Sequence, residues 1–330
     1  MTRPDGAGGA HSGGGAGDAS SGGGAPSRGV LVCVGDLVED VVVWSAAPAR
    51  YATDNPSVIH RRRGGSAGNV AAFASALVRA RFIGCVGTDV VADVLTAELA
   101  GHGVDVLVQR RGRTGTVVVL VDGNGERTMY PDRAAAAELA EVPADWLAGA
   151  AFLHVPSYCF AAEPAAASVL GLIRHATAAG VPVSLDASST GMITEFGLDR
   201  YLRLVDAIAP AVVFANAGEA ELLNVTRREF AKTMLVVKDG ARSTTVIPPS
   251  DADENRSEQT VPVPPAPAAI RDSTGAGDAF AAGFLAARMR GATSVEAATA
   301  GHTLARSVLF SPGATAPDPV DVIGQIAERR

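Results

Sequence analysis

This sequence contains few cysteines and few aromatic residues, and its basic residues do not outnumber its acidic ones. Its 330 residues include three cysteines, Cys33, Cys85 and Cys159, which lie far apart in apolar runs and show no metal-ligand spacing to the six histidines. This pattern excludes a disulfide framework and indicates reduced thiols in a cytoplasmic protein. The net charge of −7 argues against nucleic acid and anionic membrane surfaces as partners.

Long apolar runs are absent as well. No stretch reaches the roughly 20 apolar residues of a membrane span. Residues 1–28 lack the apolar core of a signal peptide and are dominated by Gly, Ser and Ala, so we predict a disordered tail there. Residues 29–330 are then expected to form the folded domain.

Two common nucleotide-binding patterns are missing from the most informative stretch, Asp272–Asp278 (D-S-T-G-A-G-D). No Lys follows its glycines, as a Walker motif requires, and Phe280 stands where a dinucleotide motif needs its third glycine. Helical spacing of apolar residues after Asp278 indicates that the stretch opens a helix. Gly275 and Gly277 would then let an anion approach unpaired N–H groups. The alternative interpretation is a plain helix N-cap.

This stretch resembles, at every position, the second signature of the ribokinase-like (PfkB) carbohydrate kinase family. The resemblance implies an ATP-dependent kinase that transfers the γ-phosphoryl group to a hydroxyl of a sugar-like small molecule, with Mg²⁺ as a further cofactor. It implies Asp278 as the general base. The N–H groups of Gly275, Ala276 and Gly277 would form the anion hole. A carboxylate at a helix N-terminus is favoured in its ionised form, so we expect Asp278 to accept a proton at neutral pH.

Two segments near the start of the domain are expected to bind the acceptor. Residues 29–35 read as a buried strand, and the resemblance places a substrate-binding carboxylate at Asp40, five residues after the strand-ending glycine. Farther on, G-G-S-A-G-N is similar to the first signature of the family. It implies that Gly64 and Gly65 bring the backbone close to a substrate hydroxyl and that the Asn69 amide binds the sugar diol.

A third set of residues is expected around the nucleotide. By resemblance, Lys238 and Gly240 (K-x-G), Thr274 and Gly313 contact ATP. Relatives often bind a monovalent cation at the backbone near Asp272, so we leave K⁺ open as a further ligand.

Asn216 and Glu219 match the N-x-x-E of the family, which organises the hydration shell of Mg²⁺. The same spacing also fits a capping box at a helix start. The two interpretations are compatible.

The order of elements predicts the fold class. From residue 151 onward, apolar strands alternate with helical segments, which is typical of a mainly parallel sheet. The resemblance implies a three-layer α/β/α domain with a small β-sheet lid, formed by segments near 40–63 and 104–132. The second segment contains a hairpin signal between 116–121 and 127–130. Because exposed lid strands often pair between subunits, we predict a homodimer through the lid.

Several positions depart from the family pattern and keep alternatives open. In the stretch Arg133–Leu139, before Glu138, alanines replace a Gly and an Asn, and Ser243 replaces a Gly. Residues 61–63 are three arginines, which either read a phosphorylated substrate or form a solvated edge. A nucleoside (adenosine-like) kinase is therefore one alternative. A catalytically silent sugar- or nucleotide-binding protein on the same fold is the other.

Overall fold

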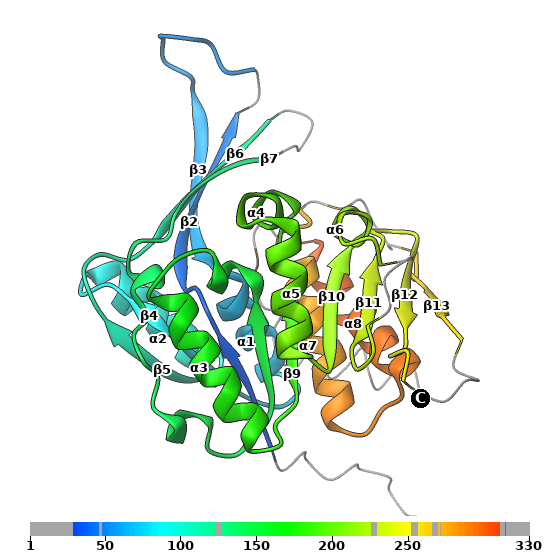
Figure 1. Cartoon of the computed structure of the whole chain (residues 1–330). Coiled ribbons are helices and arrows are strands. Elements are labelled where there is room, and N and C mark those ends of the chain that lie inside the picture. Colours follow the sequence, from blue (N-terminus) through cyan, green and yellow to red (C-terminus); the bar gives the residue numbers. More distant parts are fainter. Residues whose placement is uncertain are drawn as a thin grey trace, which may run out of the picture.

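The computed structural model describes residues 29–45, 48–122, 127–225, 230–251, 257–265, 270, 272–310 and 314. This part of the chain contains a nine-stranded sheet and a separate four-stranded sheet (Figure 1). The nine strands run in the order β13 (Gln259–Pro262), β12 (Ser243–Ile247), β11 (Met234–Lys238), β10 (Val212–Asn216), β9 (Val183–Asp186), β8 (Ala150–Pro156), β1 (Val30–Val34), β4 (Arg79–Val86) and β5 (Asp105–Arg110).

Seven neighbouring strands of the large sheet, from β11 to β5, are parallel. Strands β12 and β13 extend the sheet antiparallel at one edge. The sequence of β1, Val-Leu-Val-Cys-Val, is buried at every residue because helices cover both faces of the sheet. The predicted mainly parallel α/β sheet is confirmed.

The helices form two layers, one on each face of the large sheet. Leu31 and Cys33 of β1 belong to one core, and their neighbours Val30 and Val32 belong to the other, because alternate side chains of a strand point to opposite faces. The first core contains α1 (Ser66–Ser75), α2 (Val90–Gly101), α7 (Ala276–Met289) and α8 (Ser294–Val308). The second contains α3 (Ala165–Ala178), α4 (Thr190–Phe196), α5 (Leu198–Ile208) and α6 (Ala217–Leu222). Short 3₁₀ helices span Ala134–Glu138, Ala144–Leu147 and Ser157–Phe160.

The small sheet contains the segments predicted as the lid, so we call it the lid, and it projects away from the large sheet (Figure 1). Its strands run in the order β3 (Ser57–Gly64), β2 (Val38–Ser45), β6 (Thr116–Val121) and β7 (Arg127–Asp132). The predicted hairpin is present, since β6 and β7 pair antiparallel. The predicted second lid segment starts too early, however. Residues 105–110 form β5, which pairs with β4 at the edge of the large sheet, because their apolar side chains continue that core.

Smaller differences concern the ends of elements. The Ala-rich sequence after Asn69 predicts a helix to about Arg79, but helix α1 ends at Ser75 and Arg79 begins β4. Strand β12 was not predicted from its short sequence. The predicted tail of residues 1–28 and Gly313 lie outside the described residues. Within the described ranges, no helix combines the length and the apolar character needed to cross a membrane.

Candidate active site

The predicted site residues collect at the carboxyl ends of parallel strands. Asn216 ends β10, Lys238 ends β11, and Asp40 lies in β2 directly after β1. The chain runs from β1 to β4 on one side, whereas β8 lies on the other side of β1, so the sheet order reverses there. Crevices at such a reversal are the usual ligand sites of open α/β sheets.

Asp278 receives two side-chain hydrogen bonds from the start of α1. Ser66 Oγ donates to Asp278 Oδ1 at 2.7 Å, and Asn69 Nδ2 donates to Asp278 Oδ2 at 2.9 Å. These contacts join two helix starts that lie more than 200 residues apart in the chain. The two signatures identified in the sequence therefore meet at one carboxylate.

The pKa of Asp278 is raised, although the carboxylate is still ionised at neutral pH, as expected. Burial raises its pKa to about 6, and the hydrogen bonds from Ser66 and Asn69 and the ammonium of Lys238 oppose this rise. The helix N-terminus alone would have lowered the pKa, but the partly buried position has the larger effect. Asp278 is therefore ionised above about pH 6 and lies in the range that suits a general base near neutrality.

Asp40 is held against the first glycine signature. A Cβ on Gly64 would lie 2.0 Å from Asp40 Oδ1, so only glycine lets β3 pass this carboxylate. Gly65 has a φ of 93°, and a Cβ there would lie 2.2 Å from the carbonyl oxygen of Asp36. Burial, with the nearby charge of Asp278, raises the pKa of Asp40 to about 7.

The loop before α7 is fixed by its own first carboxylate. Asp272 Oδ1 accepts from the backbone N and the hydroxyl of Thr274 at 2.8 and 2.6 Å, and it also pairs with Arg127 of the lid strand β7. Gly275 adopts a left-handed φ of 76° just before the helix. The N–H of Ala276 donates to the carbonyl of Ser273, so this member of the predicted anion hole already has a partner.

Aromatic packing fixes the position of α7 on the sheet. The Phe214 ring of β10 packs edge-to-face against Phe284 and Phe280 of α7, with centroids 5.3 and 6.3 Å apart. This contact places the glycine loop at the carboxyl end of β10. The loop position therefore follows from core packing.

Lys238 faces the glycine loop from β11. Its Nζ lies 3.0 Å from Asp186 Oδ2, at the end of β9, and 3.4 Å from where a Cβ on Gly277 would be. The carboxylates of Asp186 and Glu219 raise the pKa of Lys238 against the effect of burial. The site thus presents a cation beside exposed backbone. Gly240 has a positive φ of 57° in the turn after β11.

Asn216 and Glu219 form a complete capping box at the start of α6. Glu219 is buried, and both of its carboxylate oxygens accept from Asn216 at 2.8 Å. Burial and the charge of Asp186 raise the pKa of Glu219. Across the described ranges no cluster of three or more His, Cys, Asp or Glu is arranged as a metal site. Asn216 and Glu219 therefore fit a Mg²⁺ ion that binds together with nucleotide phosphates and contacts the protein through water.

Two contacts of the site were not expected from the sequence. The role of Ser66 was missed, although it stands inside G-G-S-A-G-N. Asp186 ends the apolar strand β9, and its position after that apolar run was the available signal. The arginines at 61–63 do not behave alike: Arg61 is exposed, whereas Arg63 is 3% exposed and bound to protein groups. Arg63 is therefore neither solvated nor free to read a phosphate.

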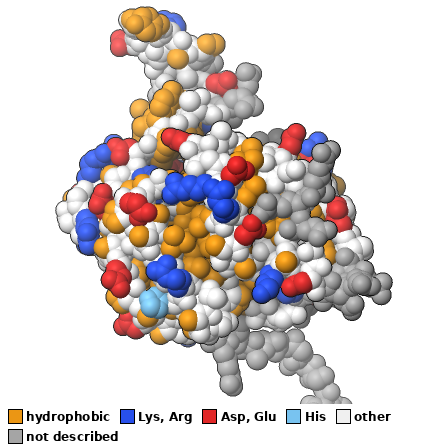
Figure 2. Space-filling view, viewed as in Figure 1, with side chains coloured by type: hydrophobic (Ala, Val, Ile, Leu, Met, Phe, Trp, Pro, Cys, Tyr) orange, Lys and Arg blue, Asp and Glu red, His pale blue; other side chains and the backbone are white. Residues whose placement is uncertain are grey.

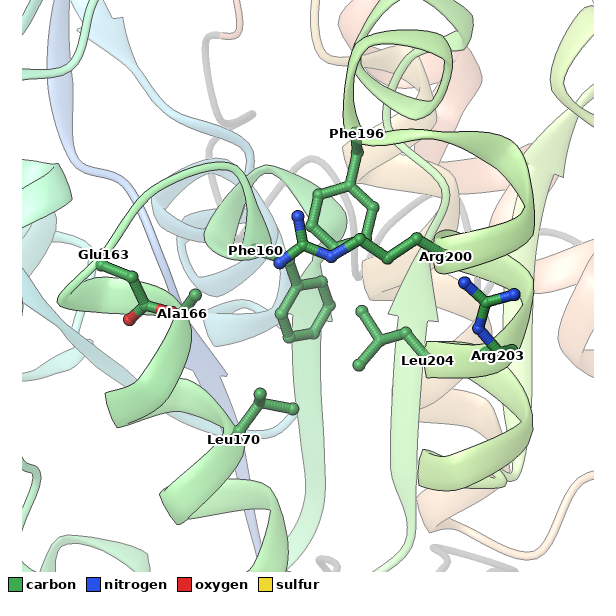
Figure 3. A pocket seen from close by; sticks show the side chains of 8 residues that line it. All are labelled: Phe160, Glu163, Ala166, Leu170, Phe196, Arg200, Arg203 and Leu204. Carbon is green, nitrogen blue, oxygen red and sulfur yellow. The ribbon is translucent and has the colours of Figure 1, made fainter.

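A surface hollow lies elsewhere, between α3 and α5. Its volume is about 270 Å³. Figure 2 shows basic side chains beside a hydrophobic patch on this face, and Figure 3 shows the lining side chains Phe160, Glu163, Ala166, Leu170, Phe196, Arg200, Arg203 and Leu204. Since none of them belongs to the constellation around Asp278, we do not assign this hollow to the reaction.

The fold and the site define a phosphotransferase that acts on an alcohol group. The sequence profile described as "pfkB family carbohydrate kinase" matches residues 30–321. The chain belongs to this family of ATP-utilising kinases.

Individual proteins agree with this assignment. A fructokinase from Klebsiella pneumoniae is 32% identical over 240 residues, which cover 68% of this chain and 76% of that protein. Among solved structures, the adenosine kinase of Sinorhizobium meliloti has a TM-score of 0.79 at 23% identity and covers 91% of this chain and 99% of its own. The fructokinase of Xylella fastidiosa with bound ATP has a TM-score of 0.75 at 20% identity and covers 92% and 99%. The two structures show the shared fold.

Proposed function

We propose that this protein is an ATP-dependent kinase that transfers the γ-phosphoryl group to a hydroxyl of a sugar or sugar-like substrate. The observation that carries the proposal is the Asp278 carboxylate, held by Ser66 and Asn69 at the mouth of the glycine loop that begins α7. A carboxylate there would repel a phosphate unless it acts on the hydroxyl next to that phosphate.

The reaction follows from the positions of the groups. Asp278 takes the proton of the substrate hydroxyl while the hydroxyl oxygen forms a bond to the γ-phosphorus. The bond between that phosphorus and the β,γ-bridging oxygen breaks, and ADP leaves. Helix-start N–H groups near Gly275 and Gly277, with the ammonium of Lys238, stabilise the charge on the transferred group.

Mg²⁺ neutralises phosphate charge when it is bound with ATP. In our proposal Asn216 and Glu219 hold its water shell through the oxygen lone pairs that their mutual hydrogen bonds leave available. Thr274, Gly240 and Gly313 remain predicted nucleotide contacts. A K⁺ ion at the backbone of Asp272 remains a prediction as well.

The lid covers the acceptor. Asp40 and Asn69 hold substrate hydroxyls, and the lid excludes water that would otherwise take the phosphoryl group. Buried thiols at Cys33, Cys85 and Cys159 support a reducing compartment, for which we propose the cytoplasm.

A nucleoside is the second candidate substrate. It is favoured by the likeness to an adenosine kinase and by an aromatic pair in the lid, Trp44 and His60, whose rings lie edge-to-face with centroids 6.0 Å apart. A base could stack on such rings. ADP release with Mg-ATP should be measured against free sugars, sugar phosphates and nucleosides. We expect turnover on free sugars. Turnover on nucleosides alone would show that the substrate is a nucleoside and not a sugar.

Replacing Asp40 with Asn should stabilise the protein at alkaline pH while weakening substrate binding. The folded-state pKa of about 7 lies above the unfolded value, so ionising Asp40 opposes folding, increasingly from about pH 4 and fully above pH 7. We expect Asp40→Asn to raise the free energy of unfolding by about 2 kcal/mol at pH 8 and by little at pH 4. Urea denaturation at both pH values measures this. A gain confined to acid pH would contradict it.

We also propose that two copies of the chain pair through the outer face of the lid. Side chains two residues apart in a strand share a face, and cross-strand register sets Val43 between Ile59 and Leu120. The apolar residues of the outer face are Val41, Val43, Ile59, Val118, Leu120 and Tyr130, and the ion pair of Glu39 with Arg61 lies on the same face. Ile59 and Tyr130 are 60% and 56% exposed, which is unusual for an apolar sheet face in a monomer.

Light scattering tests the pairing. We expect a dimer for the wild type and a monomer for a variant carrying Ile59→Glu and Leu120→Glu. Val94→Glu on α2 is the matched control, since Val94 is 59% exposed and lies away from the lid. A monomeric wild type at working concentration would contradict the proposal.

A further inference from the structure

Arg63 is a buried charge in direct contact with the candidate catalytic machinery. It lies near the end of the lid strand β3, and its side chain is 1% exposed. Nη1 donates to Asn69 Oδ1 at 2.5 Å, Nη2 donates to the carbonyl of Ala314 at 3.3 Å, and Nε donates to Glu98 Oε1 at 3.3 Å. One guanidinium thus joins the lid, α1, α2 and the segment at residue 314.

The contact with Asn69 has a chemical consequence. An amide presents an oxygen acceptor on one side and an N–H₂ donor on the other, and a guanidinium offers donors only. Arg63 therefore requires the oxygen of Asn69 to face it. The N–H₂ group must then face Asp278, to which it donates at 2.9 Å. With the amide reversed, its oxygen would face a carboxylate, and both contacts would be repulsive.

We propose that Arg63 is a positioning residue that fixes the orientation of the Asn69 amide and, through it, the carboxylate of Asp278. Its role is indirect, because Asn69 stands between the guanidinium and the base. This inference rests on the proposed kinase function. It adds a residue of the lid strand β3 to the candidate active site. Two hydrogen bonds, from Arg63 to Asn69 and from Asn69 to Asp278, link this strand to the base.

Other charged groups around Asp278 do not replace this contact. Ser66 binds the other carboxylate oxygen and leaves the amide free to turn. The charged or titratable groups that influence Asp278 from the surrounding elements are Cys33 of β1, Asp40 of β2, Arg63 of β3, Tyr158 of the 3₁₀ helix after β8, Asp186 of β9 and Lys238 of β11. Of these, Arg63 is the group with a hydrogen bond to the oxygen of Asn69.

Arg63→Met tests the orienting role by its pH profile. We expect kcat to fall by on the order of tenfold. The acid limb of kcat, near pH 6 in the wild type, should move to higher pH by about half a unit or more, because Asp278 loses a reliable N–H donor. Arg63→Lys should restore little, since a lysine cannot reach Asn69, Glu98 and Ala314 together. Arg61→Gln, an exposed arginine of the same strand paired with Glu39, should match the wild type.

A double-mutant cycle separates an orienting role from a purely structural one. If Arg63 acts through Asn69, then Arg63→Met should lower kcat little or not at all in an Asn69→Ala background. Melting temperatures are recorded alongside, and if Arg63→Met does not fold, Arg63→Lys takes its place in the cycle. Equal falls in both backgrounds, or an unchanged acid limb in an active variant, would overturn the inference. A wild type without turnover on any acceptor would instead refute the proposed function.

Discussion

Asp278→Asn is expected to lower kcat by on the order of a hundredfold or more while leaving ATP binding largely intact. The amide has nearly the same shape but cannot accept the proton of the attacking hydroxyl. The hydrogen bond from Ser66 can persist because the amide still offers an oxygen acceptor. The proposed nucleotide contacts are Lys238, which pairs with Asp186, and residues of the turns around it and of the glycine loop, and the substitution replaces none of them.

The measurement pairs a coupled ADP assay with a direct ATP-binding titration. Thermal unfolding is the control. The variant should melt near the wild type, because removing an ionised group that opposes folding at neutral pH offsets the lost hydrogen bond from Asn69. Turnover within about threefold of the wild type would remove Asp278 from the role of base.

Gly65→Ala is expected to destabilise the fold by about 3 kcal/mol or more and to abolish activity. Two effects combine at this position. The φ of 93° is strained for any residue with a Cβ, and that Cβ would lie 2.2 Å from the carbonyl oxygen and 2.6 Å from the carbonyl carbon of Asp36. Both are backbone atoms that follow β1, so relief requires the site to open.

The matched control is Gly277→Ala at the other glycine signature. Its φ is not in the left-handed region, and the nearest atom to a new Cβ is the flexible Nζ of Lys238 at 3.4 Å. Gly277→Ala should keep the unfolding midpoint, whatever its effect on phosphate binding. If urea denaturation gives both variants the stability of the wild type, the close approach at Gly65 is not required.

The sequence predicted those parts of the molecule that depend on local pattern. Continuous apolar runs gave β1 and β10, and glycines before helical spacing gave the starts of α1 and α7. The pairing of Asn216 with Glu219 as a capping box was foreseen because it depends on residues three apart. These features are decided within a few residues of chain, where periodicity and turn chemistry are informative.

Features decided by long-range packing could not be read in this way. The burial of Arg63 depends on Glu98 and Ala314, which come from distant segments. The raised pKa of Asp278 depends on how deeply α7 is set against the sheet. Likewise, β5 joined the large sheet and not the lid because of the edge that β4 presents.

One departure from the family pattern coincides with an unusual backbone conformation. Ala134 lies in the stretch Arg133–Leu139, where relatives carry Gly-Ala-Asn, and it adopts a φ of 41°, a left-handed conformation that glycine would tolerate better. The fold has constrained this position more strongly than local preference.

Detection of a phosphorylated acceptor tests the central claim most directly. The best acceptor found with the wild type should be incubated with Mg-ATP and examined by mass spectrometry, beside Asp278→Asn. We expect the wild type to add a single phosphoryl group to a hydroxyl and the variant to add almost none. An acceptor that raises the melting temperature of the wild type but never gains a phosphoryl group would show a binding protein on a kinase fold and would contradict the account.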